Sequence, residues 1–277
     1  SNPTCIIEGE YDTNKAGTYP LIFKATDKSG NTSEYSFNLN VVKPSVGGST
    51  NNDDNYEESY IPFADVIKEF KTSETEIGLD ISEWQDEPDF DKLKEAGVEF
   101  VFLRVGGTKG TNGEYFLDKS FKYNIENAKR VGIKVGIYFF SYANSKESAL
   151  KDAKWVYNQI KDYDIELPVV FDWEDWADYN DYNISFYELT EMGNSFLDYF
   201  KEKGYDSLLY SSKAYLEEIW MKLNHPVWLA HYTPNLERSS YKGDYIYWQM
   251  CSDGRIDGID GYVDINVRFK NTKKDAN

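Results

Sequence analysis

Residues 168–176 read Pro-Val-Val-Phe-Asp-Trp-Glu-Asp-Trp, a short apolar run that follows a proline and ends in acidic residues. β-Branched and aromatic residues placed after a breaker are typical of a buried strand. Because side chains alternate along a strand, Asp172 and Glu174 point to the same side, with Cα atoms ~6.5–7 Å apart. Two carboxyls in unequal surroundings can differ in pKa, so that one stays protonated while the other is ionised. Glycoside cleavage needs such a pair, although an isolated Asp-x-Glu is often just an acidic strand end.

Strand-like and helix-like segments alternate on both sides of this run, from Ile77 onward. The pattern predicts eight strands, at 77–81, 98–105, 134–140, 168–172, 207–210, 226–230, 245–250 and 262–265. It predicts five crossover helices, at 89–96, 118–131, 145–161, 185–203 and 214–222. Such alternation indicates parallel strands with right-handed crossovers, and therefore an α/β fold, a TIM-like (β/α)5(β)3 barrel. The functional site of such a barrel lies at the carboxyl ends of its strands.

Acidic side chains gather at those predicted strand ends. Asp80 ends the first strand, Asp172 and Glu174 end the fourth, and Asp264 belongs to the eighth. Tyrosine and tryptophan surround them at the ends of the other strands. Because like charges this close together cannot all be ionised, the pKa of at least one carboxyl must rise. Unpaired carboxylates gathered in this way favour an enzyme over a structural protein.

Six stretches, in order along the predicted barrel, resemble glycoside hydrolase family 25, the lysozymes (N-acetylmuramidases) that cleave peptidoglycan. They are GLDISEWQ at 78–85, GIYFF at 136–140, VFDWE at 170–174, WLAHY at 228–232, WQ at 248–249 and GIDGYVDIN at 258–266. The resemblance implies a barrel of eight strands and five helices. It also implies hydrolysis of the β-1,4 bond between N-acetylmuramic acid and N-acetylglucosamine, with glycan strands as the partner and no cofactor or metal.

The resemblance further implies the function of each site residue. Glu174 is expected to be the general acid, and Asp172 to stabilise positive charge, by orienting the 2-acetamido group of the substrate. Asp80 and Asp264 are expected to tune that pair. The side chains expected to bind the substrate are Tyr138, Phe140, Tyr210, Trp228, Tyr232 and Gln249. One departure is Phe139, where many relatives carry His, and it is expected to change a groove contact. Retaining, inverting and substrate-assisted outcomes all stay open.

The segment before the barrel has a different composition. Residues 17–32 read GTYPLIFKATDKSGNT and resemble the second half of bacterial immunoglobulin-like surface modules. Three strands are expected, at 6–10, 19–26 and 34–42, fewer than the seven or so of a complete sandwich. The predicted organisation is a partial immunoglobulin-like β module at 1–43, a polar linker at 44–60, a lead-in helix at 61–76, the catalytic barrel at 77–270 and a tail at 271–277.

Composition limits the classes of function. The net charge of −18 argues against nucleic-acid binding, which needs clustered basic residues, and no apolar run approaches the ~18 residues of a membrane span. The aromatic content of 17%, with 23 Tyr, suits a protein that stacks on sugar rings. A monomer is expected. No signal peptide is visible, so an extracellular or cell-wall location follows from the family resemblance alone.

Several alternatives remain beside the glycosidase. The same barrel could belong to a non-catalytic carbohydrate-binding protein, since fold does not fix function. His225 and His231 suggest a metal-dependent deacetylase only weakly, because a third ligand is missing. Four aspartates at 253, 257, 260 and 264 resemble a calcium loop loosely, and Ser82 lacks a His–Asp partner.

Four further side chains receive structural predictions. Trp84 and Trp155 are expected in the core, as most tryptophans are. Cys5 and Cys251 lie near opposite ends of the sequence without zinc-type spacing, and two free thiols are expected.

Overall fold

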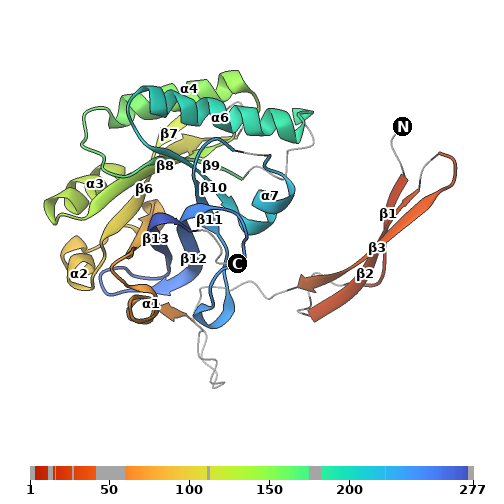
Figure 1. The fold of residues 1–277 in the computed structure, drawn as a ribbon, viewed down its shortest axis with the longest axis horizontal. Helices are drawn as coiled ribbons and strands as arrows, with labels where there is room; N and C mark the ends of the chain where they lie inside the picture. Colours follow the sequence, from red (N-terminus) through yellow and green to blue (C-terminus); the bar gives the residue numbers. More distant parts are fainter. Residues whose placement is uncertain are drawn as a thin grey trace. The chain divides into compact units, whose positions relative to one another are not determined.

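The computed structural model describes residues 4–11, 15, 17–26, 28–41, 60–110, 113–174, 182–221 and 223–273. The chain divides into two compact units, Ser1–Glu57 and Glu58–Asn277 (Figure 1). Except for Tyr60, the expected linker at 44–60 lies outside the described residues, and so does most of the expected tail.

The smaller unit is one antiparallel sheet. Its strands follow the chain in the order β1 (Thr4–Glu8), β2 (Gly17–Thr26) and β3 (Thr32–Val41). β2 and β3 pair along their whole length, and Gly30 in the turn between them has φ 86°, a conformation that glycine adopts without strain. The three predicted strands are therefore present. An immunoglobulin-like module stays a prediction, because one sheet is not the two-sheet sandwich of that fold.

The larger unit is a closed barrel of eight strands. Around the barrel they are β11 (Val227–Ala230), β10 (Ser207–Ser212), β9 (Val169–Trp173), β8 (Lys134–Ser141), β6 (Phe100–Thr108), β5 (Thr75–Ile81), β13 (Val263–Lys273) and β12 (Tyr245–Arg255). Pairing of β11 with β12 closes the ring. The predicted α/β barrel, with three strands unconnected by helices at its end, is confirmed.

The direction of one strand differs from the prediction. β13 is antiparallel to both of its neighbours, β12 and β5, whereas the alternation predicted a wholly parallel barrel. The physical reason is the short connection at 256–262, since a parallel return needs a crossover of about a dozen residues or more. This reversal matters for the site, because it brings the start of β13 to the rim where β5 ends.

The five predicted crossover helices are present. They are α2 (Phe90–Glu95), α3 (Phe121–Arg130), α4 (Lys146–Ile160), α6 (Phe186–Glu202) and α7 (Lys213–Glu218). α4 and α6 begin at Ser145 and Ser185, whose side chains accept backbone N–H bonds that the first turn cannot satisfy. α7 ends four residues before the predicted boundary. No helix in the described part of the chain is long and apolar enough to cross a membrane.

The prediction missed four short elements. β4 (Ile61–Pro62) pairs with β12, and β7 (Tyr115–Leu117) forms a hairpin with β6. Two 3-10 turns, η1 (Glu83–Gln85) and η2 (Pro234–Leu236), follow strand ends. The lead-in helix α1 (Phe63–Phe70) has the expected position, and it packs on the barrel through Phe63, Val66 and Phe70.

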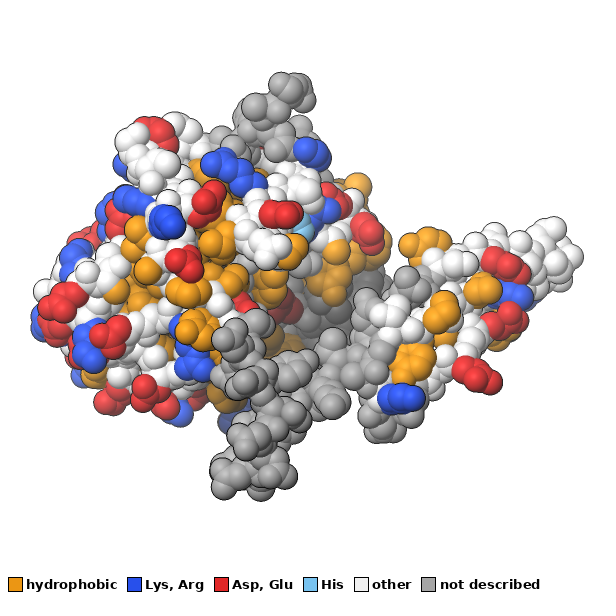
Figure 2. Space-filling view, turned by 90° about the horizontal axis from the view of Figure 1, so that it is seen from below, with side chains coloured by type: hydrophobic (Ala, Val, Ile, Leu, Met, Phe, Trp, Pro, Cys, Tyr) orange, Lys and Arg blue, Asp and Glu red, His pale blue; other side chains and the backbone are white. Residues whose placement is uncertain are grey.

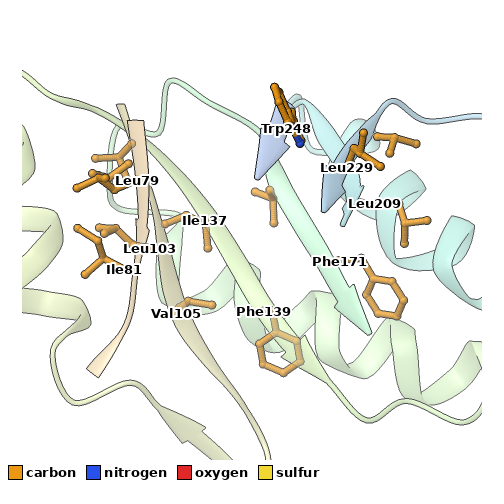
Figure 3. Packing of buried hydrophobic residues seen from close by; sticks show 14 of the residues in the cluster. Leu79, Ile81, Leu103, Val105, Ile137, Phe139, Phe171, Leu209, Leu229 and Trp248 are labelled. Atoms are coloured by element: carbon orange, nitrogen blue, oxygen red, sulfur yellow. The ribbon is translucent and has the colours of Figure 1, made fainter. Parts of the chain in front are cut away.

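Side-chain alternation gives the barrel two apolar layers. One layer packs against the helices, and Figure 3 shows strand residues that belong to it, among them Leu79, Leu103 and Ile137. The other fills the interior with aromatic rings, where Phe102 stacks on Trp228 at a centroid distance of 4.4 Å. Gly136 leaves the space for this, since a Cβ there would lie 2.3 Å from the Phe102 ring. This packed floor leaves only the upper layer of the barrel for chemistry.

Candidate active site

One cavity at the carboxyl-terminal rim of the barrel collects the predicted site residues. All ten of them line it: Asp80, Tyr138, Phe140, Asp172, Glu174, Tyr210, Trp228, Tyr232, Gln249 and Asp264. Four side chains that were not predicted for the site complete the lining: Ser82, Trp84, Gln85 and Arg104. Seven barrel strands, or the residues directly after them, thus contribute the ten residues to a single site.

The strand registers explain why the acids meet. Asp172 on β9 is level with Phe140 on β8 and with Tyr210 on β10. Asp264, near the start of β13, is the direct partner of Asp80 near the end of β5. A parallel β13 would have carried Asp264 to the opposite rim. The antiparallel return therefore completes the group of four carboxyls.

Asp80 is held by two amides. Its Oδ2 accepts hydrogen bonds from Asn266 Nδ2 at 2.7 Å and from Gln249 Nε2 at 3.0 Å. Trp228 Nε1 donates to Asn266 Oδ1 at 2.8 Å, which fixes the orientation of that amide. Asn266 is fully buried and Asp80 is 6% exposed. Donors fixed in this way favour an ionised Asp80 within an otherwise apolar surrounding.

Two tyrosines fix the second amide. The hydroxyl groups of Tyr210 and Tyr232 each donate to Gln249 Oε1 at 2.8 Å. Because the Gln249 oxygen is thereby occupied, its NH₂ group faces Asp80. Tyr232 remains 51% exposed, so its ring is available to a ligand while its hydroxyl stays anchored.

Asp264 is the protonated partner of Asp80. Burial, the negative charge of Asp80 and their shared hydrogen bond raise the pKa of Asp264 to about 9. Burial also raises the pKa of Asp80, but the hydrogen bonds from Gln249, Asn266 and Asp264 oppose that rise. At neutral pH the protonated Asp264 therefore donates a hydrogen bond to the carboxylate of Asp80.

Asp172 and Glu174 differ in their surroundings. Asp172 is 6% exposed, and burial, then the charges of Glu174 and Asp80, raise its pKa well above the ordinary range. Its Oδ1 is buried and has no hydrogen-bond partner among the described residues. Glu174 is exposed by surface area, yet the protein crowding its carboxyl, followed by the charge of Asp80, still raises its pKa. The site thus holds a rim carboxyl able to donate a proton and a buried carboxyl with an unused acceptor.

Arg104 is a lining residue that the sequence reasoning missed. Its Nε donates to Asp118 Oδ2 at 2.7 Å, and a terminal nitrogen donates to Glu83 Oε1 at 2.8 Å. Its positive charge opposes the rise in the pKa of Asp172. A signal was available, because Arg104 continues the inward-facing series of Phe100 and Phe102 along β6, where a lone charge needs a partner.

Two predictions about aromatic residues are wrong. Trp84 was expected in the core but is 78% exposed and lines the cavity, because it falls in the turn η1 and not on a strand. Phe139 was expected in the groove but is fully buried between the barrel and its helices, where its ring lies 5.6 Å from that of Trp155. Its neighbours Tyr138 and Phe140 point inward, so alternation turns Phe139 outward. Trp155 packs against the core as predicted.

The two histidines and Cys251 are not among the residues that line this cavity. His225 is bonded through Nε2 to Asp198 and through Nδ1 to Ser207. His231 contacts Ser239 Oγ through Nδ1 at 2.8 Å. Within the described ranges, no three His, Cys, Asp or Glu side chains are grouped so that they could hold a metal ion. Cys251 is a buried free thiol, while the side chain of Cys5 lies outside the described part.

The raised pKa of Asp264 predicts a pH-dependent stability. As pH rises from the ordinary value of 3.8 towards about 9, the unfolded chain releases this proton and the folded protein does not, so stability falls. Asp264→Asn keeps a donor towards Asp80 but cannot titrate. We therefore expect this variant to lose less stability than wild type as pH rises. The measurement is the melting temperature across this range, where each kcal/mol corresponds to roughly 2–4 °C. A difference between variant and wild type that does not grow with pH would contradict the assignment.

Comparisons with known proteins agree with this geometry. The model of glycosyl hydrolases family 25 matches residues 79–259. The chain is 28% identical over 197 residues to the autolytic lysozyme of Clostridium acetobutylicum, covering 68% of this chain and 54% of that protein. It therefore spans about half the length of this relative.

Two solved structures are similar over the barrel. The bacterial lysozyme from Streptomyces coelicolor has 25% identity and a TM-score of 0.60, over 73% of this chain and 94% of that one. The modular autolysin LytC from Streptococcus pneumoniae, solved with a synthetic peptidoglycan ligand, has 26% identity and a TM-score of 0.61, over 90% and 56% of the two chains.

Proposed function

The chain belongs to glycosyl hydrolase family 25, and we propose that it hydrolyses the β-1,4 bond between N-acetylmuramic acid and N-acetylglucosamine in peptidoglycan. The observation that carries this proposal is the cavity itself, where Asp80, Asp172, Glu174 and Asp264 converge with raised pKa values. Relatives named as an autolytic lysozyme and a bacterial lysozyme, and an autolysin bound to a synthetic peptidoglycan ligand, support the class of substrate.

Glu174 is the proposed general acid. It stands at the open rim, where a glycosidic oxygen can reach it, and its raised pKa keeps it protonated further towards neutral pH than a free glutamate. It donates this proton to the leaving oxygen as the bond to the anomeric carbon breaks. In the second half of the reaction it accepts a proton from the incoming water.

Asp172 is the proposed stabiliser of the reacting sugar. Its unpartnered Oδ1 suits the N–H of a 2-acetamido group, and this bond turns the acetamido oxygen towards the anomeric carbon. The oxygen then forms a bond to that carbon while the glycosidic bond breaks. A donor at Oδ1 also favours the ionised form of Asp172, so substrate binding leaves the proton of the pair on Glu174.

The other side chains position the sugar. The ionised Asp80 lies next to the pair, and the hydrogen bonds from Asp264, Asn266 and Gln249 hold it there. Aromatic rings bound the cavity, with Trp228 buried at its floor and Tyr138 against it at a centroid distance of 6.4 Å. Rigid rings and anchored hydroxyls keep a bound ring in one orientation, which is how positioning lowers a barrier.

The remaining features of the proposal concern the whole protein. The barrel is proposed to act as a monomer on glycan strands at the bacterial cell wall, and residues 1–43 to serve as a spacer module joined by the linker at 44–60. On the face of the larger unit seen in Figure 2, acidic and basic side chains are interspersed. Such a surface suits a sugar substrate better than a polyanion.

Release of reducing ends from purified peptidoglycan tests the proposal. We expect the products, analysed by mass, to end in N-acetylmuramic acid, and in ¹⁸O-labelled water this new end should carry the label. Ends on N-acetylglucosamine would contradict the proposed bond. Binding without release of reducing ends would identify the chain as a carbohydrate-binding protein.

A further inference from the structure

A second groove opens beside the catalytic cavity. Tyr232 lines both of them, so the two hollows adjoin at its exposed ring. The second groove has a volume of about 680 Å³, compared with about 240 Å³ for the catalytic cavity. Small-molecule sites usually measure ≈ 300–1,000 Å³, so this groove has room for a sugar ring.

One wall of the groove is formed by residues that precede the segment matched by the family model. Tyr60, Ile61, Pro62 and Asp65 line it, whereas the match begins at residue 79. β4 pairs in parallel with β12 through Ile61 and Gly254, which brings Tyr60 level with Asp253. Residues before the family match therefore add surface next to the proposed site.

The wall is anchored to the barrel. In α1, Phe63 is 2% exposed and Val66 is fully buried, and the ring of Phe70 meets that of Trp248 edge-on at 5.4 Å. Tyr60, in contrast, is 50% exposed. A preformed wall carrying an exposed aromatic ring costs little ordering entropy when a ligand binds.

The lining indicates the chemistry of the occupant. Tyr60 and Tyr232 offer two amphipathic rings, whose faces are apolar and whose hydroxyls are polar. Asp65 and Asp253 supply negative charge, and the described residues of the lining include no Lys, Arg or His. The groove therefore disfavours a carboxylate-bearing group and suits an uncharged sugar.

We propose that this groove binds an uncharged N-acetylhexosamine ring of the same glycan strand, beyond the sugars at the cleaved bond. The inference rests on the proposed function for its substrate. It assigns to Tyr60 a stacking contact that only longer strands can reach. The shared residue Tyr232 places the groove directly beside the catalytic cavity, and this position favours the glycan over a stem peptide as the occupant.

Peptide-free glycan strands of two lengths test this proposal. The shorter are the shortest that the protein cleaves, and the longer extend several sugars further. For Tyr60→Ala we expect kcat/KM on long strands, relative to short ones, to fall about tenfold, equivalent to ~1.4 kcal/mol, mainly through KM. Tyr60→Phe keeps the ring and should keep the ratio. Glu69→Ala, an exposed change on α1, is the control and should leave the ratio unchanged.

A ratio unaffected by Tyr60→Ala would overturn the proposal, as would equal losses on both lengths. An effect confined to strands that carry peptides would identify a stem peptide as the occupant and overturn it too. The contribution of the groove can also be measured without cleavage. Calorimetry gives the affinity of Glu174→Gln for long peptide-free strands, and the same measurement is made on the double variant that also carries Tyr60→Ala. A different outcome is that wild type cleaves no glycan strand while Tyr60→Ala still weakens this binding. In that case the proposed function fails and the groove assignment stands.

Discussion

Glu174→Gln is expected to lower kcat on peptidoglycan by about 10³-fold, within the ~10²–10⁴-fold that general acid catalysis contributes. Glutamine has nearly the shape of glutamic acid but cannot deliver a proton to the leaving oxygen. Because the side chain of Glu174 is exposed at the rim, the melting temperature should change little. Release of reducing ends under saturating substrate measures the loss.

The pH profile separates this explanation from simple misfolding. Glu174 acts in its protonated form and its pKa is raised, so wild-type activity should fall on the alkaline side as pH rises through that pKa. Glu174→Gln should lack this limb. Glu95→Gln, an exposed change on α2, is the control and should behave as wild type. Full activity in Glu174→Gln would show that Glu174 is not the general acid.

Asp172→Asn is expected to lower kcat by about 10²–10³-fold, the range seen when one preorganised electrostatic contact to a transition state is removed. An amide at this position cannot balance positive charge at the anomeric carbon. Its NH₂ group could also face the acetamido N–H and turn the nucleophile away. The kinetic measurement is the same as for Glu174→Gln, with Asp206→Asn, an exposed aspartate before β10, as the matched control.

The stability of Asp172→Asn should move in the opposite direction to its activity. Asp172 is buried with a raised pKa, so wild type loses stability as pH rises from the ordinary value of 3.8 through the raised one. Asn cannot ionise and avoids that loss, so its melting temperature at neutral pH should equal or exceed that of wild type. A variant that is inactive because it has unfolded would show a lower melting temperature.

Much of the barrel can be predicted from local patterns. Apolar runs of about five residues alternate with amphipathic segments bounded by Ser caps and by glycines after helix ends, such as Gly97 and Gly204, which have φ of 98° and 85°. These signals gave the number of strands and crossover helices. They also placed α1, although the observed helix, Phe63–Phe70, is shorter than the predicted segment 61–76.

The direction of β13 could not be read from that periodicity, because alternation is the same in either direction along a strand. The length of the connection at 256–262 was the available signal, and it excludes a helical crossover. The prediction still placed Asp264 at the catalytic rim. It did so by expecting a parallel strand that ends at residue 265, whereas β13 begins at Val263 and runs antiparallel, which brings Asp264 to the same rim.

The site was predictable as a set of residues but not as an electrostatic system. The expected strand ends identified the four carboxyls, since all strands of a parallel barrel end at the same rim. The fixed amide of Asn266, the charge of Arg104 and the exposure of Trp84 depend on packing between segments far apart in the sequence. Burial, which determines how protons divide among the acids, is a property of that packing.

The division of labour between Glu174 and Asp172 has a direct test. A dinitrophenyl glycoside of the donor disaccharide has a leaving group that needs no proton, whereas its cleavage still develops positive charge at the anomeric carbon. We predict that this substrate restores most of the activity of Glu174→Gln and little of that of Asp172→Asn. Equal rescue of the two variants, or rescue of Asp172→Asn alone, would contradict the assignment of proton donation to Glu174 and charge stabilisation to Asp172.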